Sequence, residues 1–370
     1  MTGEQANMAQ DPQKTIVLFS PIATYPIAFA AKAASLGHYK VIVVVPKEIA
    51  YHNGDHETCY LELLKDKKII VREPSEPASS DVFAIFALFS ASFYYSPSEY
   101  QSLLQWAKEA KLIGGLCHKW PTKPIPCFRA TIKYTRDHFN YVRRLNVIGF
   151  EEFPGVNLFS LYTRSVLMGI HAHPRYFHDE SVAQVLNEPW DPRQERPYKM
   201  NFLGTRAPEI RDQILKQAEA WFTSRPDLKI ADHFEQDKTG DEIRVFWRAP
   251  NREQSHPRPP REYLEILTNS DFTLCVPGYT VWSCRPPEAF LRGSIPILTQ
   301  AEAADFYDCD LVDMENCIIV YEDNWVEAIE RSFSLSLDQV IKIRIRVWEL
   351  RSRYFELSTW AARLREKLGI

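Results

Sequence analysis

Residues 269–299, NSDFTLCVPGYTVWSCRPPEAFLRGSIPILT, decide how the chain folds and where its chemistry lies. The short apolar run at 272–276 predicts a strand that is buried on both faces. Pro286 and Pro287 favour the first turn of a helix, because proline has no N–H group to leave unsatisfied there. Gly293 ends the predicted helix, and a second apolar strand follows at 295–299.

Arg285 and Glu288 carry the chemistry of this strand–loop–helix–strand unit. They are three positions apart, so both side chains can face the same side of the first helical turn. Backbone N–H groups at a helix start and a guanidinium stabilise a diphosphate, including the charge that builds on it as it leaves. A nearby carboxylate can accept both hydroxyls of a ribose. The pair predicts a nucleotide-sugar site, and helix capping with a local ion pair is the alternative.

The same segment resembles the exostosin-type, GT47-like glycosyltransferases. Their pattern runs roughly S-x-F-C-L-x-P-x-G, then S-x-R-x-x-E-A, then G-C-I-P-V. The matching residues here are Ser270, Phe272, Leu274, Pro277, Gly278, Ser283, Arg285, Glu288, Ala289, Gly293, Ile295 and Pro296. Thr273 and Cys275 exchange the family's residue order, and Ser294 replaces its cysteine. A second segment at 202–215, FLGTRAPEIRDQIL, looks like the start of the same family's donor domain.

Apolar runs and helical segments alternate along the whole chain, which predicts an α/β protein with parallel sheets. We expect two doubly wound, Rossmann-like domains facing a cleft, and the resemblance implies the GT-B architecture. The expected parts are an N-terminal acceptor domain at 13–186, a charged, proline-rich linker at 187–199, a nucleotide-sugar domain at 200–340, and a helical segment at 341–370. The last of these is expected to pack back on the N-terminal domain.

Composition excludes several classes of protein. The chain has 370 residues, enough for two domains, and its net charge of -4 gives no electrostatic case for nucleic-acid binding. Seven cysteines without a C-x-x-C pair indicate reduced thiols, and the polar N-terminus lacks a signal-peptide core. We therefore expect a cytoplasmic protein. The basic amphipathic run at 342–353 predicts a packed helix, with peripheral membrane contact as the alternative.

A second set of donor contacts is expected after the strand at 200–203. A glycine there lets the backbone approach a phosphate, and arginines add charge, although an ordinary βα turn is the alternative. The residues concerned are Gly204, Thr205, Arg206 and Arg211. The resemblance places this loop opposite the helix that begins at Arg285.

The loop of the opening segment completes the expected donor site. Either of its aromatic residues, Tyr279 or Trp282, can stack on the base or pack in the core, and we favour Tyr279 as the donor contact. The other expected contacts in this loop are Pro277, Gly278 and Ser283.

An inverting transfer also needs a general base that takes the proton of the acceptor hydroxyl. We expect it at a strand end of the N-terminal half. The candidates are Glu151, Glu152, His118, His171 and His173. Of these we choose Glu152 and His171.

No metal and no cofactor beyond the donor are expected. Residues 308–310 read Asp-Cys-Asp, a D-x-D pattern, but they lie in a predicted exposed turn past the donor motif. GT-B enzymes generally use protein cations where other classes use a metal. His171 with His173, and His52 with His56, have spacings open to zinc but no clear third ligand.

The sequence thus predicts a hexosyl- or pentosyltransferase that uses a nucleotide sugar and a glycan or glycolipid acceptor. A UDP-sugar donor and inversion at the anomeric carbon are implied by the resemblance. One alternative is a fucosyltransferase-like enzyme using a GDP-sugar, although that group favours Glu-Lys where this chain has Glu288 and Ala289. The other is a non-catalytic partner that binds nucleotide or glycan without turnover.

Overall fold

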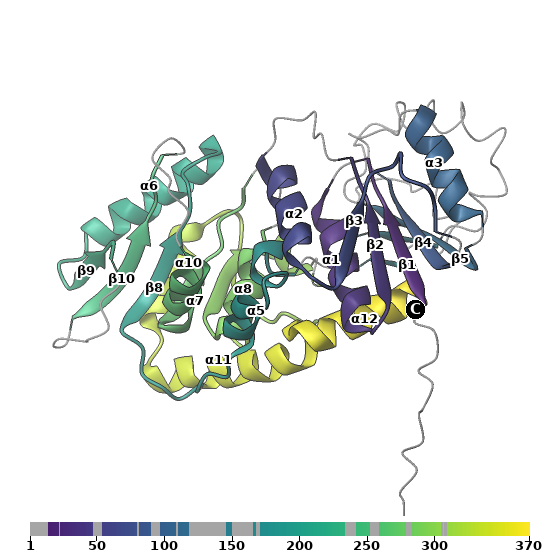
Figure 1. Ribbon diagram of the computed structural model, residues 1–370. Coiled ribbons are helices and arrows are strands. Elements are labelled where there is room, and N and C mark those ends of the chain that lie inside the picture. Colours follow the sequence, from purple (N-terminus) through teal and green to yellow (C-terminus); the bar gives the residue numbers. More distant parts are fainter. Residues whose placement is uncertain are drawn as a thin grey trace, which may run out of the picture. The chain divides into compact units, whose positions relative to one another are not determined.

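The computed structural model describes residues 14–21, 23–46, 54–79, 81–89, 97–108, 110–117, 146–149, 166–167, 171–233, 242–251, 259–278, 283–304, 306 and 309–370. These residues form two compact units, each built on its own sheet (Figure 1). The first unit takes in the described residues up to Gly149, with Val166 and Ala361–Ile370. The second unit is Leu167–Trp360.

The first sheet has seven strands in the order β3-β2-β1-β4-β5-β6-β7. The strands are β1 (Thr15–Phe19), β2 (Lys40–Val44), β3 (Ile69–Arg72), β4 (Val82–Phe89), β5 (Leu112–Cys117), β6 (Asn146–Gly149) and β7 (Val166–Leu167). The pairings from β3 through β6 are parallel. Every residue of β1 is buried, as its continuous apolar sequence predicts for a central parallel strand.

The helices described in this unit are α1 (Tyr25–Leu36), α2 (Gly54–Lys65) and α3 (Pro97–Ala107), together with the end of α12 (Leu357–Leu368). Helix α1 has a proline in its first turn, and Gly37 follows its last residue. Lys32 of α1 forms a buried ion pair with Asp66, at 2.9 Å, just after α2. This pair fixes α1 against the connection to β3.

The C-terminal segment is helical from Leu337 onward. It consists of α11 (Leu337–Leu350), a π-helical turn η3 (Arg351–Phe355) and α12. Arg365 of α12 donates to the carbonyl oxygen of Ala33 over 2.8 Å. The prediction that the C-terminal helix packs back on the N-terminal domain is therefore confirmed. In the described part of the chain, no helix is long and apolar enough to cross a membrane.

The second sheet has six strands in the order β13-β12-β11-β8-β10-β9, and its pairings are parallel. The strands are β8 (Tyr198–Leu203), β9 (Leu228–Ala231), β10 (Ile243–Arg248), β11 (Ser270–Leu274), β12 (Ile295–Thr299) and β13 (Ile318–Val320). From β8 the sheet grows toward β10 and β9, and from β11 it grows toward β12 and β13. Strand order reverses between β8 and β11, and open α/β sheets bind ligands at the carboxyl ends of strands at such a reversal.

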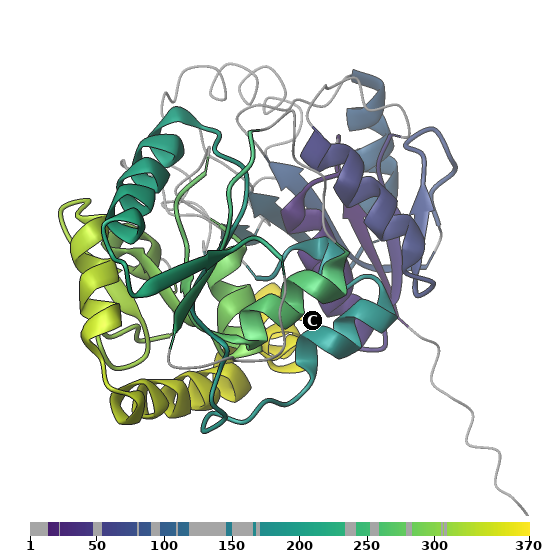
Figure 2. The same ribbon diagram turned by 90° about the vertical axis from the view of Figure 1, so that its left-hand side faces the viewer.

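Helices cover both faces of the second sheet. They are η1 (Pro174–Tyr176), α5 (Glu180–Asn187), α6 (Glu209–Thr223), α7 (Pro260–Thr268), α8 (Arg285–Arg292), α9 (Gln300–Ala304), α10 (Trp325–Ser334) and α11. Helix α10 packs on α6 and β13, whereas α8 packs on α7 and β12. Figure 2 shows these two helix pairs on opposite sides of the sheet.

Residues 187–199, the expected linker, lie within the second unit. The Trp190 ring packs against Trp348 of α11, with ring centroids 4.9 Å apart. Arg196 donates to the carbonyl oxygens of Ser270 and Gly293, at 2.7 and 2.8 Å. Two buried side chains thus anchor a segment whose composition is charged and proline-rich. The domain boundaries expected from the sequence remain predictions.

Asp271 is a buried carboxylate at the amino end of β11. Arg344 Nη1 of α11 lies 3.7 Å from its Oδ1 atom, and Lys199 Nζ of β8 lies 3.9 Å from its Oδ2 atom. The Arg344 side chain has no solvent exposure. Burial lowers the pKa of the Arg344 guanidinium, and the charge of Asp271 acts in the opposite direction. Asp271 therefore compensates the cation that α11 brings to the sheet.

We expect Asp271→Asn to lower the free energy of unfolding by about 3–5 kcal/mol, because it leaves buried cations without a carboxylate. Urea titration of the whole chain measures this loss. The control is Asp227→Asn, which removes an exposed carboxylate paired with Arg225 at 2.6 Å and should leave the unfolding midpoint nearly unchanged. Equal midpoint shifts in both variants would contradict the role given to Asp271.

Candidate nucleotide-sugar site

The loops that follow β8 and β11 meet at the reversal of strand order. The first contains Gly204 and the second contains Gly278, at the carboxyl ends of neighbouring parallel strands. Gly204 N donates to the carbonyl oxygen of Arg248 over 3.2 Å, which ties the first loop to β10 as well. The structure thus brings together two segments that the sequence analysis assigned separately to the donor site.

Arg285, the first residue of α8, bridges the ends of the two strands. Its Nη2 donates to the carbonyl oxygen of Leu203 at 2.6 Å, and its Nη1 lies 3.5 Å from that of Leu274. The guanidinium carbon lies 4.8 Å from the ring centroid of Phe202. Ser283 Oγ accepts from the backbone N–H of Arg285 at 3.1 Å. These contacts hold a cation at the carboxyl edge of the sheet.

Arg211 of α6 bridges the same two loops. Its Nε donates to the carbonyl oxygen of Pro277 at 3.0 Å. Its Nη1 and Nη2 atoms lie 3.4 Å from the carbonyl oxygens of Thr205 and Val276. A second guanidinium, from a helix on the other face of the sheet, therefore binds the loops that follow the two strand ends contacted by Arg285.

The two glycines leave the space that the two guanidiniums occupy. A Cβ atom on Gly204 would lie 2.7 Å from Nη2 of Arg285, and one on Gly278 would lie 2.7 Å from Nη2 of Arg211. Real Cβ atoms essentially never come so close to another heavy atom. A side chain at either position would have to move a guanidinium, so glycine is favoured there by close approach rather than by backbone conformation.

Arg206 has a different environment from Arg211. It forms ion pairs with Asp212, at 3.1 Å, and with Glu219, both on α6. These carboxylates raise the pKa of the Arg206 guanidinium against the effect of its desolvation. Its charge is therefore compensated by two carboxylates of α6, the helix that follows it.

Glu288, three residues into α8, is 4% exposed, and both of its carboxylate oxygens are hydrogen-bonded. Oε1 accepts from the backbone N–H of His173 at 2.9 Å, and Oε2 accepts from the hydroxyl of Tyr263 at 2.7 Å. Burial raises the pKa of Glu288, and the charge of Arg175 acts in the opposite direction. A carboxylate oxygen can accept more than one hydrogen bond, so a role toward a ribose stays a prediction.

Three residues beside Glu288 were missed by the sequence analysis. Arg175 donates from Nη2 to the hydroxyl of Tyr176, and its guanidinium carbon lies 4.6 Å from that ring's centroid. The rings of Tyr176 and Tyr263 stack at 5.6 Å. No local motif marks these residues, because they come together only through the packing of η1 and α7 around α8.

Glu302 of α9 was also missed. Its side chain accepts at Oε2 from the backbone N–H and the hydroxyl of Thr299, at 3.2 and 3.3 Å. Burial raises the pKa of Glu302 to about 8, and the charges of Arg285 and Arg211 act in the opposite direction. Its sequence signal, a threonine followed three residues later by a glutamate, is that of a helix-capping box.

Two of the candidate histidines, His171 and His173, lie within the described residues, and His171 has no solvent exposure. Its Nε2 lies 2.7 Å from the carbonyl oxygen of Phe355, and its ring lies 4.6 Å from that of Trp360. Burial lowers the pKa of His171 to about 4. This position disfavours His171 as the base. His173 is only partly buried, and desolvation together with Arg175 lowers its pKa to about 3.

The remaining candidates lie outside the described residues. They are the base candidates Glu151, Glu152 and His118, the aromatic residues Tyr279 and Trp282, and Asp308 of the D-x-D pattern. Within the described residues, no group of three or more His, Cys, Asp or Glu side chains could hold a metal ion. The expectation that the protein needs no metal stays a prediction.

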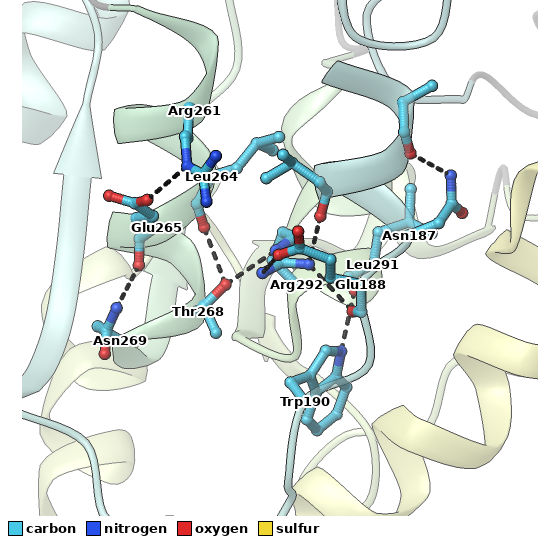
Figure 3. Close-up of polar contacts among 12 residues, drawn as sticks. Asn187, Glu188, Trp190, Arg261, Leu264, Glu265, Thr268, Asn269, Leu291 and Arg292 are labelled. Atoms are coloured by element: carbon cyan, nitrogen blue, oxygen red, sulfur yellow. Dashed lines mark hydrogen bonds and ion pairs between the residues drawn. The ribbon is translucent and has the colours of Figure 1, made fainter. Parts of the chain in front are cut away.

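Helix α8 is fixed in place by its C-terminal end (Figure 3). Arg292 donates from Nη1 to the carbonyl oxygens of Val185 and Glu188, at 2.6 and 3.1 Å, and from Nε to the hydroxyl of Thr268 at 2.8 Å. Trp190 Nε1 donates to the carbonyl oxygen of Leu291 at 2.9 Å. These contacts tie α8 to α5 and α7, and so set the position of Arg285 and Glu288.

Comparison with known proteins finds a family match over part of the chain. Residues 159–330 match the family model of the exostosin GT47 domain, which confirms the resemblance to exostosin-type glycosyltransferases over this segment. No curated protein sequence matches the chain.

Solved structures are similar to this chain at low sequence identity. A TarM variant from S. aureus, crystallised with fondaparinux, α-GlcNAc-glycerol and UDP, is 8% identical over 97% of this chain and 100% of its own, with a TM-score of 0.55. The sucrose-phosphate synthase of Thermosynechococcus elongatus is 12% identical over 96% of this chain and 99% of its own, with a TM-score of 0.48. The chain has the GT-B fold, and its residues 159–330 are similar to the exostosin GT47 domain.

Gly293, at the end of α8, and Gly369, at the end of α12, form a matched pair of positions for substitution. Gly293 has a φ of 78°, and a Cβ atom there would lie 2.4 Å from the Trp190 ring. Gly369 has a φ of 75°, and no heavy atom lies within 4 Å of its Cβ position. We expect Gly369→Ala to cost about 1 kcal/mol of unfolding free energy and Gly293→Ala about 2–4 kcal/mol, because only the second adds a collision to the left-handed backbone.

Urea titration with tryptophan fluorescence measures both variants. A loss in Gly293→Ala no larger than that in Gly369→Ala would show that Trp190 yields without cost, and the proposed fixing of α8 would fail.

Proposed function

We propose that this protein transfers a sugar from a UDP-sugar to a glycan or glycolipid acceptor, with inversion at the anomeric carbon and without a metal ion. The observation that supports it most is the pair Arg285 and Arg211. Both guanidiniums bind backbone carbonyl groups at the carboxyl ends of β8 and β11, where the strand order reverses. In these hydrogen bonds the acceptors are neutral carbonyl oxygens, so the bonds do not themselves neutralise the two positive charges.

A nucleoside diphosphate is the leaving group of such a transfer, and negative charge grows on it as the glycosidic bond breaks. Fixed cations stabilise that charge without reorganisation, which is the main electrostatic contribution of a preorganised site. The N-terminus of α8 begins at Arg285 and adds its partial positive charge. Protein cations could thereby replace the divalent ion that other glycosyltransferases use.

The rest of the donor is proposed to bind around this diphosphate. Glu288 lies one helical turn after Arg285 and is the proposed partner of the ribose hydroxyls. Tyr279 is the proposed stacking partner of the base. The UDP assignment is supported by the resemblance to the exostosin family and by the UDP in the crystals of the TarM variant. Glu152 is the proposed base, since burial disfavours His171.

Calorimetric titration with UDP, GDP, dTDP and CMP tests the donor site. UDP should bind to the unmodified protein, and Arg285→Ala should weaken it about ten- to a hundredfold, because a charge-assisted hydrogen bond is lost. Arg285→Lys keeps the charge but loses the planar guanidinium, so its affinity for UDP should lie between those of the unmodified protein and Arg285→Ala. Arg261→Ala, which removes an exposed arginine paired with Glu265 on α7, should leave binding unchanged.

The other possible results distinguish the alternative functions from a failure of the proposed site. Binding of GDP in place of UDP would favour the fucosyltransferase-like alternative. Binding without slow hydrolysis or transfer of any UDP-sugar would favour the non-catalytic alternative. Binding that survives Arg285→Ala, or no binding of any nucleotide, would overturn the proposed site.

A further inference from the structure

Glu302 lies at the same edge of the second sheet as the two arginines. It is on α9, which follows β12 directly, and β12 pairs with β11. The backbone N–H of Cys275, just after β11, donates to the carbonyl oxygen of Ile297 in β12 over 2.9 Å. The carboxyl end of β12 is therefore joined to the loop that contributes Pro277 and Gly278.

One oxygen of the Glu302 carboxyl group, Oε2, takes part in helix capping. Oε2 accepts from Thr299, and the backbone N–H of Glu302 donates back to the Thr299 hydroxyl at 3.1 Å. A second capping box, Ser336 with Gln339, ends in an exposed side chain. Glu302 is only 2% exposed, and capping does not require this burial.

The second oxygen, Oε1, is buried and has no hydrogen-bond partner among the residues that the structure describes. No ion pair within 4.0 Å joins Glu302 to a cation of the described chain. A buried polar atom without a partner costs about 1–3 kcal/mol, so its presence needs an explanation.

The charged groups around Glu302 indicate what kind of ligand could form a hydrogen bond with its Oε1 atom. Arg285 from α8 and Arg211 from α6 act on it electrostatically, and the charge of Glu302 acts in turn on the buried thiol of Cys275 after β11. Thr299 from β12 is its uncharged neighbour. An ionised carboxylate beside both arginines would repel an incoming diphosphate, whereas a neutral carboxylic acid would offer it a hydrogen bond.

We propose that Glu302 is a donor-site residue whose carboxyl group is protonated when the donor is bound and donates a hydrogen bond from Oε1 to an oxygen of the diphosphate. This inference rests on the proposed function, because it needs a diphosphate between Arg285 and Arg211. It adds an uncharged hydrogen-bond donor to the two cations. The site then binds the diphosphate together with one proton held on Glu302.

The sign of the pH dependence follows from this arrangement. The pKa of Glu302 in the free protein is raised to about 8, so the protonated, binding-competent form is present below that pH and is lost as the pH rises through it. Affinity for UDP should therefore fall about fourfold between about pH 7 and about pH 8.5. At about pH 8, binding should take up about half a proton per UDP.

The experiment is calorimetric titration of the whole chain with UDP at both pH values, in buffers of different ionisation enthalpy. Glu302→Gln keeps an uncharged side chain that can cap α9 and donate a hydrogen bond, so its affinity should not change with pH. Glu327→Gln is the control, because Glu327 holds the equivalent capping position in α10 but is exposed. It should keep the fourfold fall of the unmodified protein.

A fourfold fall and proton uptake in the unmodified protein and in Glu327→Gln, both absent from Glu302→Gln, would support the proposal. Equal pH dependence in all three proteins, or no proton uptake by the unmodified protein, would overturn it while leaving the donor site intact. Failure of every protein to bind any nucleoside diphosphate would overturn the proposed function and this inference with it. If Glu302→Gln does not fold, the proton uptake of the unmodified protein alone decides.

Discussion

Parallel strands end in carbonyl groups that have no partner within the sheet, and these groups need hydrogen bonds when they are buried. At the reversal of strand order in the second unit, Arg285 and Arg211 supply those bonds to β8, β11 and the loops that follow. The same interactions that close the sheet therefore hold two positive charges at the place where such folds bind ligands. Stability and the proposed donor recognition depend on one set of contacts.

The position of these cations depends on packing far from them. The position of helix α8 is fixed by Arg292 and Trp190 at its C-terminal end. Helix α6 packs against α10, on the face of the sheet opposite to α8. Glu288 is held by the hydroxyl of Tyr263 and the backbone of His173. The site is therefore built on helices whose rotation is restrained at both ends, which favours a preorganised arrangement.

The sequence predicted the parts of this arrangement that are local. Continuous apolar runs identified the strands, the diproline identified the start of α8, and the exostosin-like motif identified Arg285 and Glu288 as neighbours. Contacts between distant segments could not be read in the same way. The burial of His171 depends on Phe355, 184 positions away, and the isolation of Glu302 depends on the surrounding fold. A strand-end histidine and a capping glutamate look ordinary until their neighbours are known.

The close approach of Gly204 to Arg285 limits how this protein can vary. Any side chain at position 204 would occupy part of the space of the guanidinium, so a substitution there would have to move the arginine. The arginine, in turn, cannot leave without exposing two strand-end carbonyl groups. Among descendants of this sequence, the two positions should be retained or replaced together, although they belong to separate loops. Their joint inheritance would be the evolutionary record of a single atomic contact.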